Sequence, residues 1–433
     1  MRLKIISLFF LCLYFTSSFS QLEWEAKKDK ISIPFELTHN LIIIDVVVND
    51  VDLKMIFDTG SEKNLLFSFP ENDSIEFYNP REIKINGLGY GEELKAIVST
   101  KNKFNLKGLN SDNFEVLLIT EYDLSIINKM GIPINGILSA SLFKEYFMQI
   151  DYSKKRMIFY KNNVHKRKLK KYKEIAVKIS NNRPFLNLEI DKKPLNLLFD
   201  TGLGGGLWLF ENEKIKCNNN YFIDDIGRGL TGNIKGKKSR VDNLSIQQYN
   251  FKDALVSYPD SLSISNLNSL KNRNGSLGSE IIKRFNWILD YNNQIFYLKK
   301  NNYYNDPFHY NMSGIEVQHD GIEWVKEISV SEKAYQTVKA DEFIFNDRNL
   351  RNNYEYNLKP VFIIYSVREN SPAEKIGIKV GDKIIKINNK STHYMNIQKF
   401  TDLFQSEEGK LIKLEVERDG KILKFEFRLE KVL

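Results

Sequence analysis

The chain has 433 residues, of which 42% are hydrophobic and 12% aromatic, enough for the cores of about two to four domains. Only two cysteines occur and 27% of the residues are charged, which excludes a disulfide-stapled miniprotein, a collagen and a disordered chain. The formal net charge is +8, but the 63 basic residues are spread along a chain that also holds 55 acidic residues. We therefore expect no nucleic-acid partner.

Residues 1–20 have the layout of a secretory signal peptide. Arg2 and Lys4 precede an apolar run at 5–15, and a segment of small residues follows at 16–20. This run is too short to cross a membrane and no later run is long enough, so we expect no stable membrane span. We expect the mature protein to be exported, either to the periplasm or outside the cell.

Cleavage at this position would leave Cys217 as the single thiol of the mature protein. One thiol cannot form an internal disulfide, and no cysteine cluster with metal-ligand spacing is possible. We expect stability to come from apolar cores, and we expect no metal and no cofactor.

Two sequence blocks occur twice along the chain. Residues 53–60 and 195–202 are short apolar strands that both end in Asp-Thr-Gly. Residues 135–152 and 274–291 both begin with Asn-Gly and end with Asp-Tyr. Asp58 lies 78 residues before Gly136 and Asp200 lies 75 residues before Gly275, so the spacing also agrees. Two blocks repeated at matching distances predict two homologous lobes.

The apolar runs around these blocks are β-branched or alternate with polar residues, so the expected fold is mainly β. We expect an N-terminal lobe at 21–165 and a second lobe at 166–302. The basic stretch 161–173 has no apolar periodicity and is interpreted as the linker between the lobes. Because the Asp-Thr-Gly turn is doubled, one chain suffices for a symmetric site, which is compatible with a monomer.

The two Asp-Thr-Gly turns can form one acid–base site. A carboxylate at the end of a buried strand is costly unless it has partners or a task. If Asp58 and Asp200 meet at a local two-fold axis, the pair shares one proton. One carboxylate is then a general base toward a water molecule, and the other is a general acid toward a carbonyl group.

With these residues the chain resembles the two-lobed aspartic peptidases of the pepsin and retropepsin type. In that family a strand ending in Asp-Thr-Gly lies beneath a later block that ends in glycine, here 134–136 and 273–275. The resemblance implies two pseudo-symmetric β-barrel lobes with a polypeptide substrate in the cleft between them. It assigns catalysis to Asp58 and Asp200 and supporting roles to Thr59, Gly60, Ser61, Thr201 and Gly202.

The residues that follow the two turns differ. Ser61 carries a hydroxyl that can hold Asp58, whereas Leu203 at the matching position cannot hold Asp200. Since retropepsin-type sites also have an apolar residue there, we expect a pH optimum shifted toward neutral. Glycine at the third position of each tripeptide permits a close approach of the two turns.

Two glycine-rich segments are candidates for substrate-covering flaps. Segment 87–91 begins 29 residues after Asp58, and segment 227–232 begins 27 residues after Asp200. In these segments Gly89, Tyr90 and Gly229 are the candidate flap residues, with Tyr90 at the tip. The alternative is that both segments are ordinary surface β-turns.

Residues 370–388 resemble part of a PDZ domain of the kind found in bacterial exported proteases. Ser371 is a helix N-cap, Pro372 suits the first helical position and Glu374 completes a capping box. We expect a PDZ domain at 310–433 with a polar insert near 331–357. Such a domain binds the C-terminus of a peptide by adding it as a strand.

No Gly-x-Ser tripeptide and no His-Glu-x-x-His run occurs in the chain, which argues against a serine or zinc peptidase. The predicted function is that of an exported aspartic endopeptidase whose PDZ domain recruits substrate or regulates access. The alternative is a non-catalytic peptide-binding scaffold that keeps the cleft and the PDZ domain. Leu203 and Ser276, which depart from the family pattern, keep this alternative open.

Overall fold

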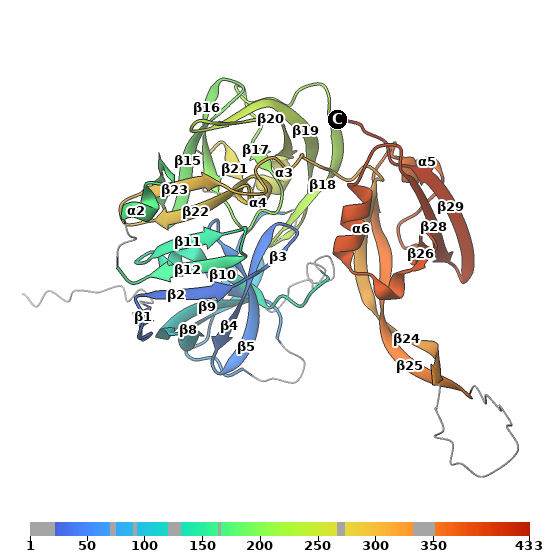
Figure 1. Cartoon of the computed structure of the whole chain (residues 1–433), viewed down its shortest axis with the longest axis horizontal. Coiled ribbons are helices and arrows are strands. Elements are labelled where there is room, and N and C mark those ends of the chain that lie inside the picture. The colour runs from blue at the N-terminus through green and yellow to red at the C-terminus, as the bar shows by residue number, and fades with distance from the viewer. Residues whose placement is uncertain are drawn as a thin grey trace, which may run out of the picture.

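The computed structural model is mainly β, with its strands arranged in four sheets (Figure 1). It describes residues 22–69, 75–89, 93–119, 131–162, 166–265, 273–331 and 351–433. The predicted signal peptide, Tyr90 and most of the predicted PDZ insert lie outside these ranges. Below, the first half means residues 22–162 and the second half means residues 166–300.

The first half forms a nine-stranded sheet with the order β1-β9-β6-β10-β5-β4-β8-β7, in which β3 also pairs with β4. Its strands are β1 (Glu23–Trp24), β3 (Glu36–Thr38), β4 (Leu41–Val48), β5 (Val51–Asp58), β6 (Leu65–Leu66), β7 (Arg81–Ile85), β8 (Leu94–Leu106), β9 (Leu109–Ile119) and β10 (Gly136–Ser139). Asn49 and Asp50 join β4 to β5 and both have positive φ, at 46° and 66°. This is the two-residue turn that matches the twist of an antiparallel hairpin.

The second half repeats these strand pairings in an eight-stranded sheet, ordered β14-β15-β16-β21-β17-β20-β19-β18. Its strands are β14 (Lys178–Ser180), β15 (Arg183–Ile190), β16 (Lys193–Phe199), β17 (Leu207–Leu209), β18 (Phe222–Gly229), β19 (Gly232–Ile246), β20 (Tyr249–Pro259) and β21 (Gly275–Leu277). In the first half β10 is parallel to β5 and antiparallel to β6, and in the second half β21 is parallel to β16 and antiparallel to β17. The duplication read from the sequence is therefore also a duplication of strand pairing.

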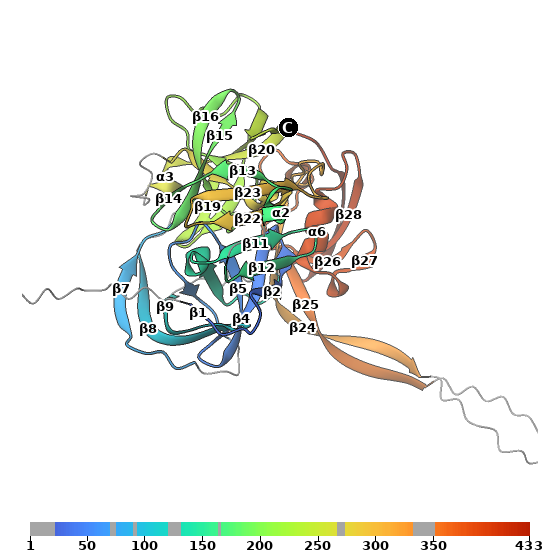
Figure 2. The same ribbon diagram turned by 60° about the vertical axis from the view of Figure 1, so that its left-hand side comes forward.

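A six-stranded sheet, called the shared sheet below, joins the two halves in the order β13-β23-β22-β11-β12-β2. It contains β2 (Lys30–Pro34), β11 (Phe147–Asp151), β12 (Arg156–Tyr160), β13 (Lys173–Ala176), β22 (Phe285–Asp290) and β23 (Ile295–Lys300). Strand β11 pairs with β22, with Gln149 opposite Ile288. In Figures 1 and 2 these strands lie between the first and second sheets, and one apolar core with members from both halves packs around them.

Short helical segments connect the strands of both halves. They are the 3-10 turn η1 (Ala140–Phe143) and the helices α2 (Lys166–Leu169), α3 (Ser261–Ile264) and α4 (Ser279–Ile282). Helix α2 lies within the stretch 161–173 that is interpreted as the linker between the lobes, and β13 begins at Lys173. The connection between the halves is therefore partly structured.

Strands from 315–331 and 351–428 form the fourth sheet, ordered β24-β25-β26-β28-β29, with β27 paired to β26. Its elements are β24 (Ile315–Ser331), β25 (Arg351–Val367), α5 (Pro372–Lys375), β26 (Lys383–Ile387), β27 (Lys390–Ser391), η2 (Thr392–Tyr394), α6 (Ile397–Phe404), β28 (Leu411–Arg418) and β29 (Lys421–Arg428). Ser371 caps α5, its hydroxyl accepting from the Glu374 N–H, as the sequence predicts. Strand β25 begins at Arg351, so residues 351–357 at the end of the predicted insert lie in this strand.

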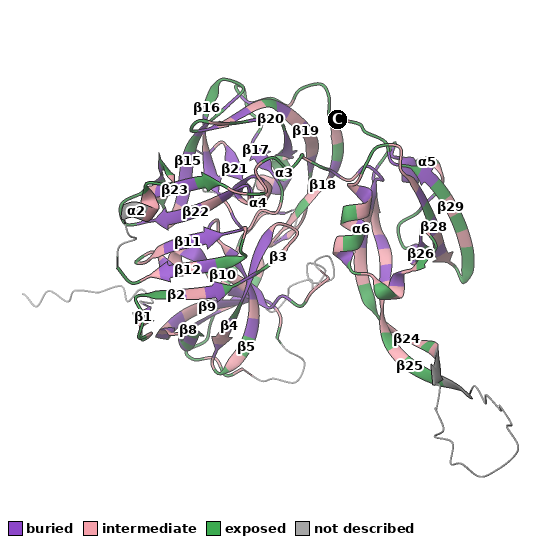
Figure 3. Cartoon of the chain, in the orientation of Figure 1, coloured by how far each residue is buried: buried purple, intermediate pink, exposed green. Residues whose placement is uncertain are grey.

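The far halves of β24 and β25 form a ribbon that projects away from the rest of the chain, and exposed residues lie along it (Figure 3). The base of this region packs on the second half. The rings of Phe222 and Tyr310 are in tilted contact, with centroids 5.4 Å apart, and Arg368 lies 4.0 Å from the buried carboxylate of Asp224.

Candidate active site

Both Asp-Thr-Gly tripeptides lie where a central strand leaves its sheet. Strand β5 ends at Asp58, which pairs with Ser139 of the parallel strand β10. Strand β16 ends at Phe199, directly before Asp200, whose N–H donates to the Leu277 carbonyl at 3.0 Å. The buried apolar residues of each strand anchor it in its sheet, so the turn that follows has a fixed position.

Asparagine side chains hold these two strands in the same way in each half. Asn135 Oδ1 accepts from the Lys54 N–H at 2.8 Å, and Asn274 Oδ1 accepts from the Asn196 N–H at 2.8 Å. These asparagines precede Gly136 and Gly275 of the second repeated block. The structure therefore gives a physical reason for the Asn-Gly pair: it bonds the strand that carries each aspartate.

The threonines of the two turns interlock. Thr59 Oγ1 accepts from the Thr201 N–H at 3.0 Å and donates to the Phe199 carbonyl at 2.6 Å. Thr201 Oγ1 accepts from the Thr59 N–H at 3.0 Å and donates to the Phe57 carbonyl at 2.8 Å. Both threonines are buried. These four reciprocal bonds tie turns that are 142 residues apart in the sequence.

The two carboxyl groups and the two glycines lie against one another. Each aspartate accepts from the N–H of its own glycine, Gly60 to Asp58 Oδ1 at 2.6 Å and Gly202 to Asp200 Oδ1 at 3.1 Å. A Cβ atom on Gly60 would lie 2.6 Å from Asp200 Oδ1, and one on Gly202 would lie 2.4 Å from Asp58 Cγ. Only glycine fits at either place, and the site brings all four residues together as the sequence predicts.

Burial and the proximity of the second carboxylate change the acidity of this pair. Burial, reinforced by the Asp200 carboxylate, raises the pKa of Asp58 from its ordinary value near 3.8 to about 7. Burial also raises the pKa of Asp200, although the Arg273 guanidinium opposes this rise. Both residues keep part of their surface exposed. A carboxyl pair that holds a proton near neutral pH and can meet solvent is suited to acid–base work.

Ser61 does not hold Asp58 through its hydroxyl, so this expectation is wrong. Ser61 Oγ instead donates to the Lys63 carbonyl at 2.7 Å, and the Ser61 backbone N–H is the group that faces Asp58. The hydroxyl completes a local turn because the Lys63 carbonyl lies only two residues away.

Two residues around Asp200 were not assigned to the site from the sequence. Ser276 Oγ donates to Asp200 Oδ2 at 3.3 Å, and the buried Arg273 donates to Ser276 Oγ. Ser276 thus supplies the hydroxyl that Leu203 lacks. The available signal was a pair of polar residues flanking Asn-Gly where the first copy has isoleucines.

The two candidate flaps meet at their tips. The Thr231 N–H donates to the Leu88 carbonyl at 3.0 Å, and a Cβ on Gly229 would lie 2.0 Å from that same oxygen. Gly89 has a φ of +124°, and a Cβ there would lie 2.5 Å from the Gly232 nitrogen. The contact joins hairpin β7–β8 to hairpin β18–β19, so these segments are not independent surface turns. Tyr90 lies outside the described residues.

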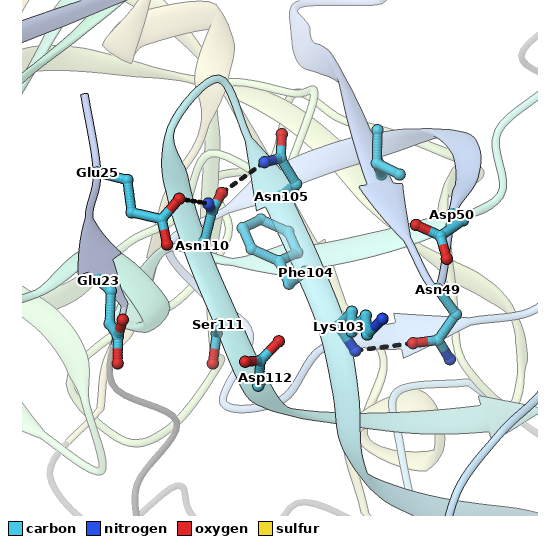
Figure 4. Close-up of a pocket in the computed structure, with 11 residues that line it drawn as sticks. Glu23, Glu25, Asn49, Asp50, Lys103, Phe104, Asn105, Asn110, Ser111 and Asp112 are labelled. Atoms are coloured by element: carbon cyan, nitrogen blue, oxygen red, sulfur yellow. Dashed lines mark hydrogen bonds between the residues drawn. The ribbon is translucent and has the colours of Figure 1, made fainter. Parts of the chain in front are cut away.

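A cavity of about 220 Å³ lies elsewhere, along the β8–β9 hairpin, and residues next to it in β1 and in the β4–β5 hairpin also line it (Figure 4). None of the predicted site residues lines this cavity. Its lining is mostly polar and consists of Glu23, Glu25, Val47, Asn49, Asp50, Lys103, Phe104, Asn105, Asn110, Ser111 and Asp112.

Within the described ranges, no group of three or more His, Cys, Asp and Glu side chains could hold a metal ion. No helix in the described part of the chain is long and apolar enough to cross a membrane.

Comparison with known proteins identifies a PDZ domain near the C-terminus, where the PDZ domain model matches residues 363–418. Over 58 residues, 13% of this chain, it is 45% identical to the carboxy-terminal processing protease CtpA of Bacillus subtilis (strain 168), of which the match covers 12%. Over 58 residues it is also 47% identical to a protein named "putative zinc metalloprotease" from Clostridium acetobutylicum, of which the match covers 16%. The similarity to both proteins is thus a similarity to their PDZ regions.

Proposed function

We propose that this chain is an exported aspartic endopeptidase in which Asp58 and Asp200 activate a water molecule, and in which the PDZ domain recruits or regulates substrate. The observation that carries the proposal is the reciprocal bonding of Thr59 and Thr201, which holds the two carboxyl groups against each other's glycine. The shared architecture of the two halves supports it, since strand pairing and blocks recur together.

The proposed reaction needs one proton on the carboxyl pair. The ionised carboxylate takes a proton from water as the water oxygen bonds to the scissile carbonyl carbon, and the neutral carboxyl gives its proton to the carbonyl oxygen. The tetrahedral intermediate then breaks its C–N bond: the carboxyl that took the water proton gives it to the departing nitrogen, and the other carboxylate takes a proton from a hydroxyl of the intermediate as the carbonyl group re-forms. No covalent enzyme intermediate forms, and the pair returns to its singly protonated state.

The substrate class follows from the same elements. The meeting hairpins, through Leu88 and Thr231, would cover an extended polypeptide and exclude water from the site. The PDZ domain would bind a peptide C-terminus by strand addition. Two proteins that share this PDZ region bear protease names, which is compatible with a PDZ domain attached to a peptidase. Export is proposed from the layout of residues 1–20.

The direct test is cleavage of a peptide library by the full mature chain between pH 3 and 8. We expect cleavage by the wild-type protein and a loss of at least about 100-fold in Asp58→Asn and Asp200→Asn, because either change removes an acid or a base. Asp52→Asn is the matched control, since Asp52 is exposed on the same strand as Asp58. Cleavage near the wild-type rate in either site variant would refute catalysis by the Asp58–Asp200 pair.

The same assay separates the alternative of a non-catalytic scaffold. A scaffold would bind peptides without cleaving them, and its affinity would be unchanged when either aspartate becomes asparagine. Binding measured by fluorescence anisotropy with a labelled peptide, in parallel with cleavage, distinguishes the two functions.

A further inference from the structure

The two Asp-Thr-Gly turns differ in what lies behind them. In the first half the Asn-Gly pair is flanked by Ile134 and Ile137, which are apolar. In the second half the matching residues are Arg273 and Ser276. Arg273 is only 9% exposed, so a fixed cation stands on one side of an otherwise symmetric site. Burying an arginine is costly, and it therefore needs an explanation.

A continuous set of hydrogen bonds leads from this cation to one aspartate. The Arg273 guanidinium donates through Nε to the Gly275 carbonyl at 3.1 Å and through Nη2 to Ser276 Oγ. Ser276 Oγ in turn donates to Asp200 Oδ2 at 3.3 Å. Because Arg273 fills an acceptor position of the serine oxygen, the serine hydrogen is directed toward Asp200. A carboxylate that receives a hydrogen bond beside a cation is favoured in its ionised form.

We propose that Arg273 and Ser276 make Asp200 the ionised member of the carboxyl pair, and so the base toward water, while Asp58 holds the proton and acts as the acid. This inference rests on the proposed peptidase function. In the reaction Asp200 accepts a proton from the attacking water, and Asp58 donates its proton to the substrate carbonyl oxygen.

The other charges around the pair agree with this assignment. Arg273 interacts with both carboxylates, but Asp200 affects its pKa more strongly than Asp58 does. Arg273 is also the largest charge among the causes that shift the pKa of Asp200, whereas for Asp58 that charge is Asp200. Arg183 also lies near Arg273, but it is paired with Glu62 Oε1 at 2.6 Å. The buried Tyr291 is a further titratable neighbour of Asp58, and burial raises its pKa so that it stays neutral. Burial lowers the pKa of Arg273 only to about 10, so it remains a cation at neutral pH.

The test titrates each carboxyl alone by NMR of full-length protein labelled with ¹³C at the aspartate carboxyl carbon. In the Asp58→Asn variant, Asp200 is the carboxyl of the pair that remains, and in the Asp200→Asn variant it is Asp58. We expect Asp200 to titrate at lower pH than Asp58. Adding Arg273→Met, which keeps an unbranched stem but removes the guanidinium, raises the titration midpoint of Asp200, and Ser276→Ala raises it by a smaller amount. Arg273→Lys restores part of the shift.

Arg284→Met is the matched control, because Arg284 is also a buried arginine but donates to the Glu280 carbonyl four residues earlier and to the Asp306 carbonyl. It should leave both midpoints unchanged. If Arg273→Met does not fold, Ser276→Ala carries the test, since it removes one atom only. An Asp58 midpoint below that of Asp200, or an Asp200 midpoint unmoved by both variants, would overturn the proposal.

The titration is independent of catalysis, so the two proposals can fail separately. If the wild-type protein cleaves peptides, Arg273→Met should move the acidic limb of the kcat/KM profile to higher pH, with at least about a tenfold loss at pH 4 and a smaller loss at the optimum. If Asp200 titrates below Asp58 but the protein cleaves no peptide, the proposed peptidase function is refuted. The assignment of Asp200 as the ionised carboxylate then still holds.

Discussion

Thr59 and Thr201 show how a single hydroxyl can serve two purposes in a buried turn. Each hydroxyl fills the hydrogen-bonding capacity of the opposite backbone, as acceptor from an N–H and as donor to a carbonyl. An unpaired buried donor or acceptor costs about 1–3 kcal/mol, so removing either hydroxyl would be costly. The threonines therefore position the turns, and the proposed chemistry is assigned to the aspartates that precede them.

The raised pKa of Asp58 predicts how stability depends on pH. The folded protein holds this proton up to about pH 7, whereas an unfolded aspartate releases it near pH 3.8. Between these values the folded state binds more protons, so the free energy of unfolding falls as the pH rises. The asparagine in Asp58→Asn cannot titrate, so the free energy of unfolding of this variant should fall less between pH 4 and pH 8 than that of the wild type. Relative to the wild type, the variant should therefore be more stable at pH 8 than it is at pH 4.

Urea denaturation at both pH values measures this difference, and Asp52→Asn should behave like wild type. An Asp58→Asn protein that keeps the full pH dependence would show that Asp58 is ionised in the folded state at all of these pH values.

At the scale of elements, the turn after β16 can be probed with two neighbouring glycines. A Cβ on Gly202 would lie 2.4 Å from Asp58 Cγ, whereas a Cβ on Gly205 meets no atom within 4 Å. Gly202→Ala must push the turns apart, and we expect a loss of about 1–3 kcal/mol in stability together with lost peptidase activity. Gly205→Ala should be neutral or stabilising by up to about 1 kcal/mol.

Thermal denaturation and the cleavage assay, run on both variants, decide the point. Equal effects of the two substitutions would mean that the turns do not depend on their close contact.

The strand content could be predicted because it depends on local patterns, and the meeting of the two turns could be predicted because their sequence block is duplicated. β-Branched runs such as 41–48 predict strands, and a duplicated Asp-Thr-Gly block predicts a doubled site. The shared sheet could not be predicted, since the pairing of β11 with β22 joins segments more than 130 residues apart and no local pattern records it. The bonds of Arg273 and Ser276 were missed for a similar reason: their meaning depends on a neighbour, Asp200, that is distant in the sequence.

At the scale of the whole molecule, the shared sheet should couple the stability of the two halves. Ile150 of β11 is fully buried and lies opposite Trp287 of β22. Ile150→Ala leaves a cavity in the core used by both halves and should cost about 2–5 kcal/mol. Because that core is continuous, hydrogen exchange should accelerate in β9 of the first sheet and in β20 of the second sheet to a similar extent.

Lys299→Ala on the exposed side of β23 is the control, with an expected change in the free energy of unfolding within about 0.5 kcal/mol. Faster exchange confined to β9 would mean that the halves unfold independently and that the site is assembled from two separately stable units.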